Sequence, residues 1–353
     1  MLVNTSLPPG DTAVQQRYAP RPLPLFLQLV RLASESDPEL ARAALRGLAR
    51  YEAAQRPTSR PQRPAIAESG AATLRDCGGD GAPVVLIPSL INPPEILDLD
   101  GDVSLAGAIA RGGRRALLVD WGSAAERSAL DLGGHIETLL VPLLETLDQP
   151  PAVIGYCLGG TMAIAAANHT AVERVATIAA PWRFSGYGDD ARGALARLWS
   201  AARPGAQRMG ALPMEVLQGA FWSLDPLRTV SKFARFAEVA PGSDRERRFV
   251  TLEDWANEGE PLPLPAAREL IEDLFAADLP GSDQWTVGER RVSADLDCAT
   301  LHVIASDDRI TPAASAPPGQ TEKIGAGHVG MVVGSRRKRL HAILAEFLAA
   351  PCR

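Results

Sequence analysis

The chain has 353 residues, of which 46% are hydrophobic and 22% are charged, and its formal net charge is −6. This balance excludes a disordered chain and is enough for a large core, in one sizeable domain with an insertion or in two smaller domains. A nucleic-acid-binding protein needs a basic excess, so we expect no nucleic-acid partner.

The cysteines indicate the environment of the protein. Cys77, Cys157, Cys298 and Cys352 are scattered without a CxxC pair. This pattern fits neither a disulfide framework nor a zinc site, so we expect no metal and a reducing, cytoplasmic location. We also expect no signal peptide, because no basic segment followed by an apolar stretch opens the chain. Residues 149–172 lack Asp, Glu, Lys and Arg, but prolines and glycines interrupt them, so we predict a buried strand, turn and helix and no transmembrane segment.

The first predicted element is a helix in an N-terminal arm, residues 1–75. Asp37 is expected to cap this helix, whose first position is a proline, and Ser36 with Glu39 forms a candidate capping box. A proline-rich connector follows at residues 56–64.

Short apolar runs separated by glycine turns begin near Thr73. Strands are predicted at residues 84–88, 116–119, 152–154, 175–179 and 301–305, and helices at residues 134–147 and 335–350. Apolar strands that alternate with helices indicate an α/β protein with a mostly parallel sheet covered on both faces. Between the fourth and fifth strands, helical patterns with five of the six tryptophans predict a cap. The expected domains are the arm (1–75), a first core part (76–181), a helical cap (182–290) and a second core part (291–353).

The most informative motif is residues 153–161, an apolar strand followed by Gly-x-Cys-x-Gly-Gly and a helical segment. A nucleophile on a sharp strand-to-helix turn needs small neighbours two positions away on each side, and Gly155 and Gly159 fill those positions. Cys157 is therefore the predicted nucleophile, activated by the helix N-terminus and a nearby base. The backbone N–H of Leu158 is placed to donate to an oxyanion. The alternative is a buried structural cysteine beside a glycine turn. The turn is not the dinucleotide-binding GxGxxG motif, because Gly155, Gly159 and Gly160 have the wrong spacing.

A cysteine nucleophile needs a base, and the base needs an orienting acid. Asp308 follows the predicted strand at 301–305, and His328 lies in a glycine-rich loop before the last helix. Asp307 competes for the role of acid, but the frame Asp-x-Ile-x-Pro favours Asp308. The remaining histidines are interpreted as surface or core residues: His135, His169, His302 and His341.

The loop after the first clear strand, residues 87–94, is where a second oxyanion donor is expected. Leu90 N–H is the preferred donor and Ile91 the fallback, and the alternative is a plain turn that ends the strand.

These residues resemble the polyhydroxyalkanoate synthase family, which are α/β-hydrolase-fold acyltransferases with a cysteine in the lipase box. Residues 155–161, Gly-Tyr-Cys-Leu-Gly-Gly-Thr, are similar to the family's cysteine box. Five further pieces look like family elements in the same order: the Ile-Asn and Ile-Leu-Asp-Leu block (87–99), the Asp-Trp strand end (118–122), a cap element (254–263), the acid loop (308–312) and the histidine loop (327–330). The resemblance covers about residues 80–345.

The resemblance implies an α/β-hydrolase fold with a helical cap. It also implies that Cys157 takes a 3-hydroxyacyl group from a coenzyme A thioester and passes it to a hydroxyl acceptor or a growing polyester, with His328 as base and Asp308 orienting it. Trp255 and Ile91 are candidate substrate or lid residues. The coenzyme A thioester is a substrate, so no cofactor is expected. The expected partners are a second copy of the chain or a partner synthase subunit. The expected location is the cytoplasm, at polyester granules.

Three positions depart from the family pattern. Arg309 replaces the usual histidine after the acid, Ser89 replaces a proline, and the basic run 335–339 replaces an Asn-Pro-Pro turn. Two alternatives remain open: a thioesterase or polyester depolymerase on the same scaffold, and a non-catalytic partner subunit of a polyester synthase. A serine nucleophile would favour the first, and a broken triad would favour the second.

Overall fold

The computed structural model of the protein describes residues 18–56, 62–99 and 101–351, which fall into two compact units. The smaller unit is assigned Met1–Pro57 and Pro226–Asn257, and the larger unit Thr58–Asp225 and Glu258–Arg353. Cys352 and most of the predicted proline-rich connector lie outside the described residues.

The larger unit is built on an eight-stranded sheet with the order β1-β2-β4-β3-β5-β6-β11-β12. β2 pairs antiparallel with β1 and with β4, whereas the pairs from β4 to β12 are parallel. The strands are β1 (Ala65–Ser69), β2 (Ala72–Gly78), β3 (Pro83–Ile87), β4 (Arg115–Asp120), β5 (Ala152–Tyr156), β6 (Arg174–Ile178), β11 (Ala299–Ala305) and β12 (Thr321–Ile324). The mostly parallel α/β sheet predicted from the sequence is confirmed.

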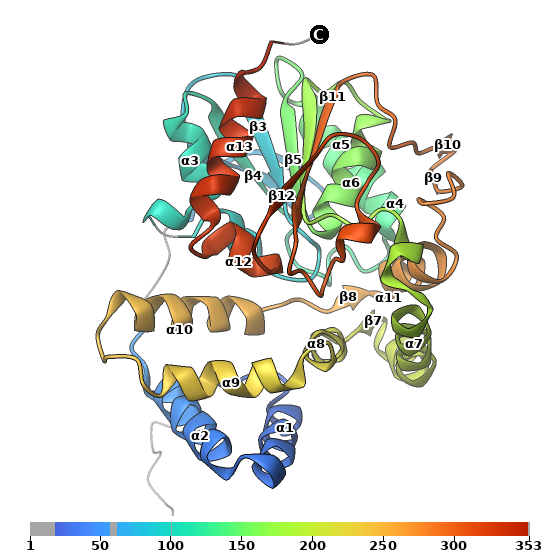
Figure 1. Ribbon diagram of the computed structural model, residues 1–353. Helices are drawn as coiled ribbons and strands as arrows, with labels where there is room; N and C mark the ends of the chain where they lie inside the picture. The colour runs from blue at the N-terminus through green and yellow to red at the C-terminus, as the bar shows by residue number, and fades with distance from the viewer. Residues whose placement is uncertain (1–17, 57–61, 100, 352–353) are drawn as a thin grey trace, which may run out of the picture. The chain divides into compact units, whose positions relative to one another are not determined.

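Helices cover both faces of this sheet. In Figure 1, α3, α12 and α13 lie on one side of it and α4, α5 and α6 on the other. β3, β5 and β6 are buried along their whole length, which explains why they are continuous apolar runs. The α-helices of the larger unit are α3 (Leu105–Arg111), α4 (Leu132–His135), α5 (Val141–Glu145), α6 (Leu158–Ala167), α7 (Asp189–Met209), α8 (Met214–Ser223), α11 (Leu264–Arg268), α12 (His328–Val333) and α13 (Arg337–Ala349).

Shorter elements complete the larger unit. A π-helical turn, η3 (Ile136–Leu140), joins α4 to α5, so that the predicted helix at residues 134–147 is one helix with a bulge, and a second π-helical segment is η5 (Glu269–Ala276). The 3-10 turns are η1 (Pro94–Leu97), η2 (Gly101–Val103), η4 (Phe184–Tyr187) and η6 (Ala313–Ser315). Two small ribbons pair β7 (Ala211–Leu212) with β8 (Leu262–Pro263), and β9 (Thr286–Val287) with β10 (Arg290–Arg291).

The register of the sheet places four loops at the same edge. Ile87 at the end of β3 pairs with Gly155 of β5, and Tyr156 of β5 pairs with Ile178 of β6. Ala305 at the end of β11 pairs with Ile324 of β12. Because carboxyl ends of parallel strands meet at one edge, the loops after β3, β5, β11 and β12 lie at the end where ligands bind in open α/β sheets.

The smaller unit consists of four helices, α1 (Leu23–Ser36), α2 (Pro38–Ala53), α9 (Pro226–Phe236) and α10 (Asp244–Asn257). α2 packs so closely on α9 that a Cβ atom at Gly47 would lie 1.9 Å from the carbonyl oxygen of Phe233. The rings of Tyr51, Phe233 and Phe249 pack edge to face within this unit, with centroids 5.4–6.3 Å apart.

The start of α2 confirms one predicted cap and corrects another. The Asp37 side chain accepts a hydrogen bond from Leu40 N at 2.9 Å, as predicted. Ser36 does not form the expected capping box with Glu39; it ends α1, and its hydroxyl donates to the Ala33 carbonyl at 3.3 Å. The arm, for which one helix was predicted, therefore contains two helices, α1 and α2.

The predicted cap, residues 182–290, is divided between the two units. Residues 226–257 group with the N-terminal helices, whereas the remainder, with α7, α8, α11 and η5, belongs to the larger unit. The division into arm, core and cap stays a prediction. Among the described residues, no helix combines the length and the apolar character needed to cross a membrane.

Candidate active site

Cys157 lies on the sharp turn between β5 and α6. Its backbone has φ 56° and ψ −131°, a strained conformation for a residue with a side chain, and its side chain is partly exposed. Its N–H donates to the Ile178 carbonyl of β6 at 2.9 Å, which ties the turn to the sheet. The strain persists because the strand and helix on each side fix the backbone.

Two glycines make this turn sterically possible. A Cβ atom at Gly155 would lie 2.3 Å from the Gly159 carbonyl oxygen, and one at Gly159 would lie 2.2 Å from the Ile87 carbonyl oxygen. Both distances are too short for a real Cβ, so the spacing Gly-x-Cys-x-Gly is imposed by packing. The second contact also shows that the start of α6 packs directly on the loop after β3.

The side chains of Asp308 and His328 are in direct contact. His328 Nδ1 lies 2.6 Å from Asp308 Oδ2, and both side chains are almost fully buried. The other carboxylate oxygen, Asp308 Oδ1, accepts the N–H groups of Ile310 and Thr311, each at 2.8 Å. Asp307 is exposed, so Asp308 is the carboxylate that contacts the histidine.

The charges around His328 favour its protonated form. Burial opposes a charge on the imidazole, but the negative charge of Cys157, hydrogen bonds to Asp308 and Cys157, and the charge of Asp308 together raise the pKa of His328 to about 10. The three side chains therefore interact in the order Cys157, His328, Asp308. The imidazolium is stabilised whenever Cys157 is a thiolate.

The hydrogen bonds of the loop after β3 distinguish its two candidate oxyanion donors, Leu90 and Ile91. Ile91 N–H already donates to Ser89 Oγ at 3.2 Å. Within the part of the chain that the structure describes, no hydrogen bond uses the N–H of buried Leu90. Leu158 is the first residue of α6, so its N–H has no acceptor within the helix. Leu90 and Leu158 are thus the available donors. Trp121 Nε1 holds the loop that carries Leu90 by donating to the Pro88 carbonyl at 3.1 Å.

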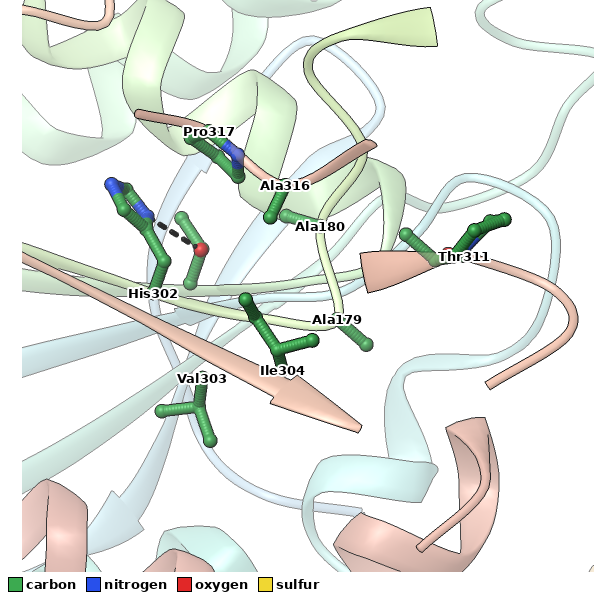
Figure 2. Close-up of a pocket in the computed structure, with 10 residues that line it drawn as sticks. Ala179, Ala180, His302, Val303, Ile304, Thr311, Ala316 and Pro317 are labelled. Atoms are coloured by element: carbon green, nitrogen blue, oxygen red, sulfur yellow. Dashed lines mark hydrogen bonds between the residues drawn. The ribbon is translucent and has the colours of Figure 1, made fainter. Parts of the chain in front are cut away.

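The buried histidines outside this cluster have other partners. His302 Nδ1 contacts Thr177 Oγ1 at 2.9 Å beside a small cavity that Thr311 also lines (Figure 2). His135 Nδ1 lies 2.6 Å from the Asp131 carbonyl oxygen. Burial lowers the pKa of both imidazoles to about 4. They are therefore neutral core histidines, in agreement with their interpretation from the sequence.

Two tyrosines near the cluster were not predicted. Tyr156 immediately precedes Cys157, and its ring centroid lies 5.0 Å from that of His328. Tyr187 of η4 has its pKa raised by burial and by the negative charges of Cys157 and Asp308. The position of Tyr156 beside the nucleophile was visible in the sequence, but nothing local marked Tyr187.

The remaining candidates lie elsewhere or form other contacts. Trp255 is a buried residue of α10 in the smaller unit, and its predicted lid role stays a prediction. Arg309, which replaces the family's histidine, is largely exposed and pairs with Asp225 at 2.9 Å. Among the residues described, no cluster of His, Cys, Asp or Glu is arranged to hold a metal ion.

Comparisons with known proteins relate the chain to one group of enzymes. No family model matches it. It is 25% identical over 278 residues to the poly(3-hydroxyalkanoate) polymerase subunit PhaC of Haloferax mediterranei, covering 72% of this chain and 56% of that protein. It is 24% identical over 290 residues to the subunit of the same name from Thiocystis violacea, covering 75% and 80%. The chain therefore spans little more than half the length of the Haloferax relative.

A solved structure shows the fold. It comes from a study of epoxide hydrolases of the α/β-hydrolase superfamily in metagenomes from hot environments, and it matches with a TM-score of 0.50 at 16% identity over 82% of this chain and 100% of that one. This chain itself has a mostly parallel eight-stranded sheet and a sharp strand-to-helix turn at Cys157. The chain is therefore similar in sequence to poly(3-hydroxyalkanoate) polymerase subunits and has an α/β-hydrolase fold.

Proposed function

We propose that the protein is an acyltransferase of the polyhydroxyalkanoate synthase type. It moves 3-hydroxyacyl groups from coenzyme A thioesters, through an acyl-cysteine on Cys157, to a hydroxyl acceptor or a growing polyester. The observation that carries this proposal is the contact of Cys157 with the buried His328–Asp308 pair, at a strained turn, in a relative of polymerase subunits.

The first half-reaction forms the acyl-cysteine. His328 takes the thiol proton, and the Cys157 thiolate attacks the thioester carbonyl. The N–H groups of Leu158 and Leu90 donate to the oxygen that becomes negatively charged. Asp308 accepts a hydrogen bond from His328 Nδ1–H, which leaves Nε2 to exchange protons with the sulfur. The carbon–sulfur bond to coenzyme A then breaks, and the departing thiolate receives the proton from His328.

The second half-reaction transfers the acyl group. His328 takes the proton of the acceptor hydroxyl, whose oxygen attacks the acyl-cysteine carbonyl. The bond from carbon to the Cys157 sulfur breaks, an ester forms, and the proton returns to the thiolate. If water takes the place of the acceptor, the product is a free 3-hydroxy acid, so the exclusion of water distinguishes a transferase from a hydrolase.

The similarity to poly(3-hydroxyalkanoate) polymerase subunits supports the proposed substrates and partners. Because they are polymerase subunits that this chain covers only in part, we carry over an acyl-coenzyme A donor and a polyester product as proposals, together with a second copy or a partner synthase subunit. Light scattering of the purified protein, alone and with substrate, measures whether it self-associates.

One experiment separates the proposal from its alternatives. Purified protein is incubated with 3-hydroxybutyryl-coenzyme A, and free thiol, insoluble polyester and free 3-hydroxybutyrate are measured in parallel, with Cys157→Ala as control. Thiol release matched by polyester or an acylated hydroxyl acceptor is the expected result. Release matched by free acid would make the protein a thioesterase, and no release would favour a non-catalytic subunit.

A further inference from the structure

Tyr156 is an unexplained polar residue beside the proposed catalytic histidine. It ends β5, is 3% exposed, and carries a buried hydroxyl for which the described residues provide no hydrogen-bond partner. Its ring lies against the imidazole of His328, with centroids 5.0 Å apart and planes inclined by 34°. The contact is therefore made by the aromatic face and not by the hydroxyl.

An aromatic ring within about 6 Å attracts a cation electrostatically, and the attraction grows where water is excluded. In the mechanism above, His328 becomes an imidazolium each time it takes a proton. A ring at 5.0 Å interacts more favourably with that imidazolium than with the neutral imidazole. It also limits the angles that the imidazole can adopt.

We propose that Tyr156 is a positioning residue whose aromatic ring stabilises the imidazolium of His328, while its hydroxyl takes no part. The effect of the Tyr156 ring on turnover rests on the proposed function, in which His328 is the base. The effect on the protonation of His328 does not depend on turnover.

Two charged groups interact with His328, and further charged residues lie on elements packed against its helix. Asp308 lies in the loop after β11, and Cys157 lies on the turn after β5. α12 packs against η1, which carries Glu95, and against α13, whose first turn holds the basic residues 337–339. A comparison of variants at Tyr156 in one background keeps all of these groups unchanged.

The experiment measures the pKa of His328 directly. Protein with ¹⁵N-labelled histidine is titrated by NMR in a Cys157→Ser background, which removes the thiolate, and His328→Gln identifies the resonance among the five histidines. Tyr156→Phe keeps the ring and removes only the unpartnered hydroxyl, so the pKa should not change. Tyr156→Leu removes the ring, so the pKa should fall by about half a unit to one unit.

Equal pKa values of His328 in the Phe and Leu variants would overturn the proposal, whether both values fall or neither does. If the Leu variant does not fold, Tyr156→Met provides the same comparison with a more adaptable apolar side chain. Because the serine background cannot form an acyl-cysteine, the result stands whether or not the wild-type protein transfers acyl groups. Failure of the proposed function and failure of this inference therefore give different observations.

Discussion

The imidazole of His328 and the carboxylate of Asp308 are joined by a 2.6 Å hydrogen bond, and the Asp308 side chain has no exposed surface. Backbone N–H groups hold the other carboxylate oxygen from the opposite side. Asp308 cannot rotate without losing hydrogen bonds that buried groups cannot replace with water. The orientation of the imidazole is therefore fixed by the fold.

Asp308→Asn should leave the fold intact and disable the base. The amide oxygen still accepts the two backbone N–H groups, but the amide nitrogen then faces His328 Nδ1 and favours the wrong tautomer. We expect thiol release from 3-hydroxybutyryl-coenzyme A to slow by about 10²–10⁴-fold. Asp307→Asn is the matched control, because Asp307 is exposed and its removal should change the rate little. A greater loss in the Asp307 variant would show that the wrong carboxylate has been assigned.

Gly159→Ala should damage both stability and activity. Its Cβ would lie 2.2 Å from the Ile87 carbonyl oxygen and 2.6 Å from that of Pro88, so the loop with the proposed donor Leu90 must shift. Overpacking of this kind costs about 1–3 kcal/mol or more of unfolding free energy. In the control, Gly193→Ala, the nearest atom lies 3.5 Å from the new Cβ, and a gain of up to ~1 kcal/mol is expected. Denaturant unfolding and thiol release measure the two effects, and equal stability of both variants would contradict the packing argument.

Stability should fall in mild acid. The folded protein holds the pKa of His302 and His135 at about 4, whereas an unfolded histidine titrates near 6.5. Between these values the unfolded chain binds more protons, so the free energy of unfolding should fall as the pH is lowered from about 6.5 to about 4. In His302→Gln the fall should be shallower over the same range, measured by urea unfolding at several pH values. A slope identical to that of the wild type would mean that His302 does not contribute.

Trp255→Ala tests the proposed lid. The resemblance assigns Trp255 to a cap element, and an acyl-cysteine that waits for a hydroxyl acceptor must be protected from water. We expect the ratio of free 3-hydroxy acid to polyester or ester product to rise, whereas Trp255→Phe, which keeps an aromatic ring, should change the ratio less. If the ratio stays constant in a folded alanine variant, Trp255 serves only the core of its own helical unit.

Local chemistry made the core of the site predictable. The turn at Cys157 requires glycines two positions away on each side, and the sequence has Gly155 and Gly159 at those positions. Asp308 and His328 follow a buried strand and a glycine-rich loop, so their order along the chain indicated their meeting. The buried parallel strands were predictable for the same reason, since burial on both faces leaves continuous apolar runs.

Long-range packing explains what was missed. β1 and β12 are partly exposed edge strands with polar residues, so they give no apolar run. The grouping of residues 226–257 with the N-terminal helices depends on contacts such as Gly47 with Phe233, which lie far apart in the sequence. The place of Tyr156 against His328 arises only when the loop after β12 folds over the end of β5.

In the proposed function Cys157 carries the acyl group, which can be detected by mass spectrometry of the protein quenched during turnover of 3-hydroxybutyryl-coenzyme A. We expect one added 3-hydroxyacyl group on the peptide that contains Cys157. It should be retained in Cys77→Ala, Cys298→Ala and Cys352→Ala, whereas Cys157→Ala should lose both the acyl group and thiol release. An acyl group found on another residue, or full turnover by Cys157→Ala, would contradict it.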